Sequence, residues 1–367
     1  MSGIHRRILA WALSAAAGIT CVAHGADGRV DPLLRQTATK LFHQGAPGIA
    51  IAVIFHGETY FWTGGSSGRP GLSVTPRTIF ETASISKVFT TALLGVDVAS
   101  GRLSLDQPVR KDLHGYPLRG HMRQATFEML ATFTAGLPLD PPALENLPLE
   151  RQGIDNFSTD EFLRFVSEWR PPRPLPASCR YSNVSVGLLG LCLGRQRLGL
   201  FEGRLLRLVL RPLGMHDTML FLDAPHAARL AVGETAGGTP AAEWPVDADA
   251  AADGIKSTIS DLAQFLRGMM GLSTDVPPTL AAGLVLSANH GFFVDGEFQA
   301  LGWRWKPISL NGVNAWAVSK NGDIPGFSTE LAFNKDLGIG VAILTNRSDL
   351  PAEETGIELI QSLWQLE

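Results

Sequence analysis

The sequence predicts an α/β fold of the α+β type, in which an antiparallel sheet built from both chain ends is flanked by helices. Three observations predict it. Strand-like apolar runs lie near both ends of the 367-residue chain. Helical patterns joined by Pro- and Gly-rich loops fill the middle. The length suits one large unit, or two interleaved ones, with a sizeable core. We therefore expect one sheet, with an inserted and mainly helical region packed against it.

The first 25 residues have the layout of a secretory signal peptide. His5-Arg6-Arg7 forms a basic start, residues 8–22 form an apolar stretch, and residues 23–25 are suited to cleavage. The apolar stretch is short for a transmembrane helix. We therefore expect export to a periplasm, no stable membrane anchor, and a single mature unit over residues 26–367.

The first strands and the first apolar helix follow. Residues 47–55 (PGIAIAVIF) are typical of a buried strand, residues 56–58 of a turn, and residues 59–63 of a returning strand. Residues 84–100 form an apolar helical stretch that ends just before Gly101. This part of the chain, residues 26–100, is expected to form one half of an α/β subdomain.

The middle of the chain, residues 101–290, is predicted to be a mainly helical subdomain. The proline pairs 141–142, 171–172 and 277–278 mark breaks between its helices. The helices are expected at residues 125–133, 159–169, 184–198, 202–211 and 258–271.

Strand signals return in residues 291–367, which complete the α/β subdomain. Residues 315–320, 328–334 and 338–345 are β-like, and a turn at Asn334-Lys335-Asp336 joins the last two. Residues 352–366 are predicted to close the chain as an amphipathic helix.

Charge and composition exclude several function classes. The net charge is −4 and no basic run stands out, so nucleic acid is not an expected partner. The sequence has no CxxC, HExxH or acidic calcium-loop motif, and no metal or other cofactor is expected. Cys179 and Cys192 are expected to be buried thiols, because the helix between them separates them too far for a disulfide. A monomer is expected.

Ser84-Ile85-Ser86-Lys87 is the strongest chemical signal. A serine three residues before a lysine at a helix start is the layout of an S-x-x-K nucleophile. Residues i and i+3 share a helix face, so Lys87 can reach Ser84 Oγ. A second serine, Ser66, lies in a G-x-S-x-G pattern. Proline and glycine follow it where that motif requires a helix, so a hairpin exit is expected there instead.

Two later motifs carry polar groups at element ends. Tyr181-Ser182-Asn183 precedes an apolar helix, and Lys320-Asn321-Gly322 ends a strand. Taken singly, each has a structural explanation: a buried tyrosine with a helix-capping asparagine, and a strand exit with an exposed lysine. Gly322 is expected to let a ligand approach the backbone closely.

Together the three motifs, in this order, resemble those of the serine β-lactamase and penicillin-binding protein superfamily, and of class C β-lactamases in particular. The similarity extends over nearly all of the mature chain. It includes Phe80-Glu81 before the serine and the stretches at residues 130–139, 181–190, 211–215, 254–258 and 337–347. The resemblance implies the β-lactamase/transpeptidase-like fold.

The resemblance also implies roles for site residues. Ser84 would be the nucleophile, with Lys87 or Tyr181 as its base, and the sequence leaves that choice open. The backbone N–H groups of Ser84 and Asp323 would form the oxyanion hole. Asn183 would hold the substrate amide and Lys87. Lys320 and Asn346 would receive a ligand carboxylate.

The chain departs from the family pattern at four places. Asn321 replaces a threonine, Asp140 stands where a glutamine is usual, and Glu234 stands where a tyrosine lines the side-chain pocket. The stretch from Trp305 to Lys320 is short, which predicts a more open cleft on that side.

The implied function is that of an exported serine hydrolase that opens β-lactam rings. The alternatives are a penicillin-binding D,D-carboxypeptidase or endopeptidase that acts on peptidoglycan stem peptides, and an esterase of the same fold. A non-catalytic penicillin-binding sensor is a fourth interpretation, which the intact nucleophile and base candidates disfavour. The expected partner is therefore a small-molecule β-lactam or a peptidoglycan peptide.

Overall fold

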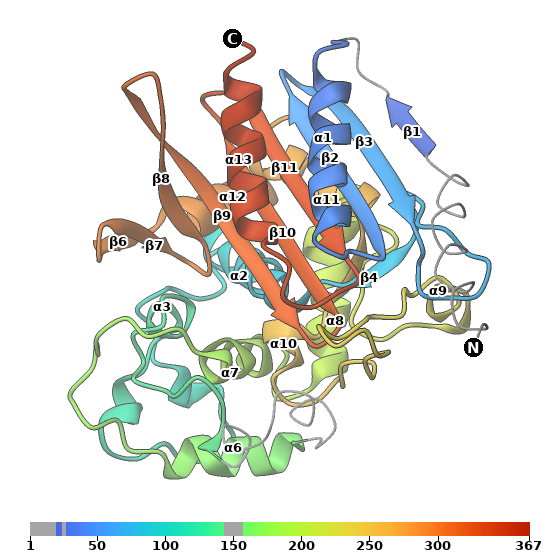
Figure 1. Ribbon diagram of the computed structural model, residues 1–367. Coiled ribbons are helices and arrows are strands. Elements are labelled where there is room, and N and C mark those ends of the chain that lie inside the picture. Colours follow the sequence, from blue (N-terminus) through green and yellow to red (C-terminus); the bar gives the residue numbers. More distant parts are fainter. Residues whose placement is uncertain (1–19, 24–26, 143–156) are drawn as a thin grey trace, which may run out of the picture.

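The computed structural model describes residues 20–23, 27–142 and 157–367. Within these residues a nine-stranded sheet runs through the molecule, in the order β1-β3-β2-β11-β10-β9-β8-β7-β6 (Figure 1). A two-stranded sheet, β4-β5, lies apart from it. All described pairs within the two sheets are antiparallel. The strands are β1 (Thr20–Ala23), β2 (Gly48–Phe55), β3 (Glu58–Gly65), β4 (Ile79–Glu81), β5 (Lys256–Thr258), β6 (Gly291–Val294), β7 (Glu297–Ala300), β8 (Arg304–Leu310), β9 (Val313–Ile324), β10 (Phe327–Asn334) and β11 (Ile339–Thr345).

The two ends of the chain meet inside this sheet. Strand β2 from the N-terminal part pairs with β11 from the C-terminal part, with Ile51 opposite Ile343. Both strands are buried at every position. Strands that are covered on both faces have almost continuously apolar sequences, and the sequences of β2 and β11 show this pattern. The predicted sheet built from both chain ends is therefore confirmed.

Helices cover both faces of the sheet. Helices α1 (Val30–His43) and α13 (Ala352–Trp364) pack on one face, and α11 (Ile259–Met269) packs on the other (Figure 1). Helix α2 (Ser86–Ala99) lies against α12 (Pro278–Asn289) in close backbone contact. A Cβ atom on Gly95 of α2 would come within 2.2 Å of the Gly283 carbonyl oxygen, so only glycine permits this approach.

The helical region lies below the sheet in the view of Figure 1. Its longest buried helix, α7 (Asn183–Leu193), is buried at every position after its first residue, and it packs against α2. Its other elements are α3 (Phe127–Ala131), α6 (Thr159–Glu168), α8 (Leu198–Leu205), α9 (Ala224–Ala227), α10 (Ala250–Asp253), the π-helical turn η4 (Leu206–Leu210) and the 3-10 turns η2 (Val109–Lys111), η3 (Gly120–Gln124) and η5 (Arg211–Leu213). A further 3-10 turn, η1 (Ala83–Ile85), directly precedes α2.

Several element boundaries differ from the sequence prediction. The helix expected at 184–198 ends at Leu193, where Gly194 caps it. The helix expected at 202–211 begins earlier, at Leu198, and continues as the π-helical turn η4. Ser84 lies in the 3-10 turn η1 rather than in the helix itself, which begins at Ser86. Helices α1 and α12 and strands β6 to β8 were not predicted.

Most of the predicted signal peptide, including residues 1–19, 24 and 25, lies outside the described residues. Residues 20–23 form β1, which pairs with β3 at one edge of the sheet. Cys179 and Cys192 are free thiols, as expected, but only Cys192 is buried, whereas Cys179 is half-buried. In the described part of the chain no single helix is long and apolar enough to cross a membrane. Two helical segments joined by a sharp bend, residues 183–193 and 198–213, would together be long and apolar enough, by length and composition alone.

Candidate active site

Ser84 and Lys87 lie where the 3-10 turn η1 leads into α2. Ser84 is half-buried, whereas Lys87 is fully buried in the first turn of the helix. The Lys87 ammonium donates hydrogen bonds to Ser84 Oγ at 2.9 Å and to the Ala252 carbonyl at 3.0 Å. A serine hydroxyl oriented by a buried amine is the arrangement expected of an activated nucleophile.

Hydrogen bonds from both neighbouring sheets hold η1 in place. Thr82 Oγ1 donates to the Ile255 carbonyl at 2.6 Å, and the Thr82 carbonyl accepts from Thr329 Oγ1 at 3.1 Å. Ser86 Oγ accepts from the Ile255 N–H at 2.9 Å. Ala83, directly before Ser84, has a φ of +49°, a left-handed conformation that is unfavourable for a residue with a side chain. Such strain persists only where the surroundings impose it, and it is concentrated at functional sites.

Tyr181 lies between the two lysines of the site. Its ring centroid is 4.9 Å from Lys87 Nζ and 5.0 Å from Lys320 Nζ, and the Phe133 ring packs on it at 4.9 Å. The residue is 40% exposed, and its hydroxyl group is close enough to Ser84 and Lys87 for both to help lower its pKa. Desolvation opposes ionisation of the phenol, yet the ammonium groups of Lys320 and Lys87 outweigh it and lower the pKa of Tyr181 to about 8.

Lys320 lies on β9, on a stretch with one free edge. Strand β8 pairs with β9 only as far as Ser319, whereas β10 pairs with it as far as Ile324. In the described ranges no strand pairs with residues 320–324 on the β8 side. The Lys320 ammonium, 7% exposed, donates to the Asn321 carbonyl at 2.6 Å. A strand edge with free polar groups beside a nucleophile can take an extended substrate.

Gly322 brings β9 into contact with η1. A Cβ atom there would lie 2.4 Å from the Thr82 carbonyl oxygen and 3.0 Å from Ala83 Cβ. The sequence predicted that this glycine lets a ligand approach the backbone closely. The structure shows instead that it admits the chain's own backbone, directly before the nucleophile.

Replacing Gly322 by alanine is expected to destabilise the protein by about 1–3 kcal/mol, because the added methyl group must push η1 away from β9. Thermal unfolding measures this change. The matched control is Gly199→Ala in α8, where a Cβ atom meets nothing within 4 Å. Equal unfolding temperatures for the two variants would contradict the close approach described here.

The structure assigns Asn183 a different partner from the predicted one. Its Nδ2 donates to Asp140 Oδ1 at 2.8 Å, and its buried Oδ1 has no hydrogen-bond partner among the residues that the structure describes. Lys87 bonds to Ser84 and Ala252 instead, so the prediction that Asn183 holds Lys87 is wrong. Asp140, predicted from its place in the sequence to face the substrate, occupies the Asn183 amide.

Asn346 is likewise not placed to receive a ligand. The side chain is 0% exposed, and its Nδ2 donates to the Ser66 and Val232 carbonyls at 3.3 and 3.0 Å. The prediction that it binds a carboxylate is therefore wrong in this structure, because it ties two loops together. Glu234, expected in a side-chain pocket, pairs with Arg347 at 2.7 Å.

Asn321 of the third motif and Asp323, just after the motif, face one another. Asn321 Nδ2 donates to Asp323 Oδ2 at 3.0 Å. Asp323 directly follows Gly322 on β9, which lies next to the turn that carries Ser84. This is where the predicted oxyanion donor, the Asp323 backbone N–H, would have to be. Desolvation raises the pKa of the Asp323 carboxyl, while hydrogen bonds from Ser328 and Asn321 oppose the shift. A small cavity of about 180 Å³ adjoins Tyr181, Lys320 and Asn321.

Buried carboxyl groups beside Lys87 were missed at the sequence level. Asp249 directly precedes α10 and Asp253 is its last residue, and the Ala252 carbonyl of the same helix accepts from Lys87. Glu81 is the last residue of β4. Desolvation, reinforced by Asp249, raises the pKa of Asp253 to about 8, and Lys87 only partly offsets it. Desolvation raises the pKa of Glu81 to about 7. The acidic run over residues 247–253 was a visible signal, but its burial was not.

Asp253→Asn is expected to stabilise the protein at alkaline pH. The unfolded carboxyl ionises near pH 3.8, whereas the folded one stays protonated to about pH 8. Wild-type stability therefore falls as pH rises between these values, and asparagine removes that dependence. We expect the variant's Tm to exceed that of the wild type by about 2 °C or more at pH 8, and by less toward pH 4. The same comparison for the exposed Asp336→Asn should show no such trend. A constant Tm difference across pH would overturn this prediction.

The described residues contain no group of three or more His, Cys, Asp and Glu side chains that could hold a metal ion.

Comparison with known proteins identifies the family. The family model for "Beta-lactamase" matches residues 27–363. A β-lactamase from Pseudomonas fluorescens is 30% identical, over 89% of this chain and 94% of its own length. One from Escherichia coli K12 is 29% identical, over 90% and 92%.

Solved structures share the fold. A class C β-lactamase from Rhodobacter sphaeroides has a TM-score of 0.77 at 23% identity, covering 92% of this chain and all of that one. A variant class C β-lactamase has a TM-score of 0.80 at 23% identity, covering 95% and all of its chain. By its family model, its full-length relatives and its fold, this chain belongs to the serine β-lactamase family, with the architecture of the class C enzymes.

Proposed function

We propose that this protein is an exported serine hydrolase that opens β-lactam rings through an acyl-enzyme on Ser84. The observation that carries the proposal is the hydrogen bond of 2.9 Å from Lys87 to Ser84 Oγ, beside a tyrosine held between two lysines. Nucleophile, base candidates and a cation for an anionic substrate thus occupy one small region. The full-length relatives named as β-lactamases support the same reaction.

Acylation begins when Ser84 Oγ attacks the lactam carbonyl carbon. The hydroxyl proton passes to Tyr181 or Lys87, the carbonyl becomes an oxyanion, and the C–N bond of the ring then breaks. The departing nitrogen takes a proton from the same base. Main-chain N–H groups at Ser84 and Asp323 are proposed to bind the oxyanion, and one such donor typically contributes about 3 kcal/mol to transition-state stabilisation. Water then cleaves the ester and frees Ser84.

Lys320 is the cation proposed to bind the substrate carboxylate. It lies on the free edge of β9, next to Tyr181, and it has no acidic partner among the ion pairs of the described residues. An unpaired ammonium attracts a carboxylate more effectively than one already neutralised. Asn321, in place of a threonine, offers an amide instead of a hydroxyl beside that anion.

Export to a periplasm is proposed from the basic start and the short apolar stretch of residues 1–25. N-terminal sequencing of protein recovered from the periplasmic fraction tests it. A mature chain that begins at or near Ala26 is the expected result, and an unprocessed chain in the cytoplasm would contradict it.

A second candidate is a D,D-carboxypeptidase or endopeptidase that acts on peptidoglycan stem peptides. The observation that favours it is the Asp140 carboxylate on the Asn183 amide. This contact occupies the Asn183 amide N–H, a donor that the side chain of a β-lactam would use. The Asp140 carboxylate also places negative charge where an ammonium group of a peptide could bind. Such an enzyme would form the same Ser84 acyl-enzyme with penicillin but release it slowly.

The deciding experiment measures turnover of the chromogenic lactam nitrocefin by the purified protein from Ala26 onward. Rapid catalytic turnover supports the β-lactamase. A stable Ser84-dependent penicillin adduct, seen by mass spectrometry without turnover, moves the assignment to the peptidase. Neither signal, together with hydrolysis of a simple ester, would move it to an esterase of the same fold.

A further inference from the structure

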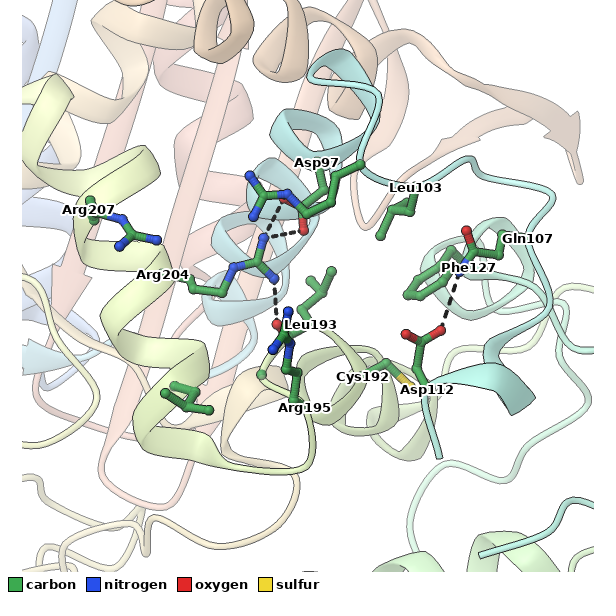
Figure 2. A pocket seen from close by; sticks show the side chains of 13 residues that line it. Asp97, Leu103, Gln107, Asp112, Phe127, Cys192, Leu193, Arg195, Arg204 and Arg207 are labelled. Atoms are coloured by element: carbon green, nitrogen blue, oxygen red, sulfur yellow. Dashed lines mark hydrogen bonds and ion pairs between the residues drawn. The ribbon is translucent and has the colours of Figure 1, made fainter. Parts of the chain in front are cut away.

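A cavity of about 450 Å³ lies in the helical region, away from Ser84. It is bordered by Asp97 near the C-terminal end of α2, by Cys192 to Arg195 at the end of α7, and by α8 and η4 (Figure 2). The first two motifs, with Ser84 and Tyr181, lie at the opposite, N-terminal ends of α2 and α7. The 14 residues of α2 place the two sites about 20 Å apart along that helix.

Four arginines converge on this cavity from three segments of the chain: Arg102, Arg195, Arg204 and Arg207. Among the described residues, the acids in its lining are Asp97 and Asp112. The fully buried Asp97 pairs with Arg204 and with Arg102, the latter at 3.2 Å. Arg204 also donates to the Leu193 carbonyl at the end of α7, at 2.5 Å. These bonds fix the guanidinium of Arg204 in the wall of the cavity, as Figure 2 shows.

Two of the arginines are not neutralised in this way. Within the part of the chain that the structure describes, the side chains of Arg195 and Arg207 form no hydrogen bond or ion pair. Arg195 and Asp112 attract each other electrostatically but form no ion pair within the described residues, and Asp112 accepts a hydrogen bond from Gln107. Burial raises the pKa of that carboxyl, while the hydrogen bond from Gln107 opposes the shift. The cavity therefore has an excess of positive charge.

The backbone that presents Arg195 is strained. Arg195 and Gln196 have φ values of +50° and +63°, in the left-handed region that favours glycine. The Gln196 amide donates to the Asp112 carbonyl at 3.2 Å and holds this turn against the opposite wall. Two successive left-handed residues with long side chains are costly, and such strain commonly marks ligand-binding segments.

The opposite wall is partly apolar. In the view of Figure 2, Leu103 and Phe127 lie across from Arg204 and Arg207. The cavity thus combines a cationic side with an apolar side, which is the composition expected of a pocket for a small amphipathic anion.

We propose that this cavity binds a small phosphate monoester that carries an apolar group. A phosphate monoester has a charge close to −2 at neutral pH, which matches the two unneutralised arginines. Its tetrahedral oxygens can accept from guanidinium groups that approach from different directions, whereas a carboxylate is planar and suits one fork.

The test uses phenyl phosphate as the probe, measured by isothermal titration calorimetry on the full mature protein at constant ionic strength. We expect a Kd of about 1 mM or tighter, and weaker binding of inorganic phosphate and benzoate. The double variant Arg195→Ala/Arg207→Ala should bind phenyl phosphate about tenfold or more weakly. It should turn over nitrocefin at the wild-type rate, because neither residue contacts the site at Ser84.

Two control variants show whether phenyl phosphate binds in this cavity or elsewhere on the protein. Arg197→Ala removes an exposed arginine from the same turn that does not line the cavity, and it should leave the Kd unchanged. Lys320→Ala should also leave it unchanged, which excludes binding at the Ser84 site. Absence of phenyl phosphate binding, equal loss in the Arg197 variant, or loss in the Lys320 variant would each overturn the proposal. None of these results bears on the proposed lactam hydrolysis.

Discussion

Replacing Ser84 by alanine is expected to lower nitrocefin turnover by at least about 10⁴-fold and to abolish covalent labelling by penicillin. Removal of the nucleophile in an enzyme that uses a covalent intermediate eliminates the acylation step itself, and losses of this size or larger are typical. Lys87 and Tyr181 remain in such a variant, but without Oγ they have no hydroxyl to activate.

The matched control is Ser66→Ala. Ser66 is the serine of the G-x-S-x-G pattern, and in the structure it is exposed and its Oγ accepts from the Gly68 N–H at 3.0 Å. No helix follows it. This variant should keep wild-type turnover. A penicillin adduct that persists in Ser84→Ala, or that disappears in Ser66→Ala, would show that Ser84 is not the nucleophile.

Much of the site follows from local rules. The i, i+3 spacing predicted that Lys87 reaches Ser84, and the structure places their side-chain atoms 2.9 Å apart although Ser84 itself is in a 3-10 turn. The resemblance of the three motifs to those of class C β-lactamases predicted that Tyr181 and Lys320 join them, and the Tyr181 ring centroid lies 4.9 Å from Lys87 Nζ and 5.0 Å from Lys320 Nζ. Spacing within a motif and its place on an element are properties of the sequence.

Partner choice could not be predicted in the same way. Asn183 binds Asp140, and Asn346 binds the carbonyl oxygens of Ser66 and Val232. Each asparagine had several polar groups within reach in the fold, and only three-dimensional packing selects among them. The same holds for Asp253, whose burial depends on elements far away in the sequence.

The fold shows a similar division. The buried strands β2 and β11 were predicted because covered strands are apolar throughout. Helix α1 was missed although its buried residues, Val30, Leu34, Ala38 and Leu41 among them, recur at helical spacing. Strands β6 to β8 were missed for a physical reason, since most of their residues are exposed or only partly buried and their sequences lack a clean alternation.

Replacing Tyr181 by phenylalanine is expected to lower kcat/KM for nitrocefin by roughly 10²- to 10⁴-fold, the usual loss when a general acid–base group is removed. The ring, its packing on Phe133 and its contacts with both lysines are retained in this variant. Only the hydroxyl is lost. Tyr116→Phe is the matched control, because the Tyr116 hydroxyl bonds to Asp160 at the surface and should not affect turnover.

The pH profile distinguishes a base from a positioning group. If the phenolate accepts the Ser84 proton, wild-type kcat/KM should rise with pH up to about 8, the pKa to which Lys320 and Lys87 bring Tyr181 against its desolvation. In Tyr181→Phe, kcat/KM should be lower and should no longer show this rise with pH. A variant within a few-fold of the wild type would exclude Tyr181 as the base and leave Lys87, already bonded to Ser84 Oγ, to take the proton. If kcat/KM of the variant is low but still rises with pH in the same way, the titrating group is elsewhere, and the hydroxyl of Tyr181 only orients its neighbours.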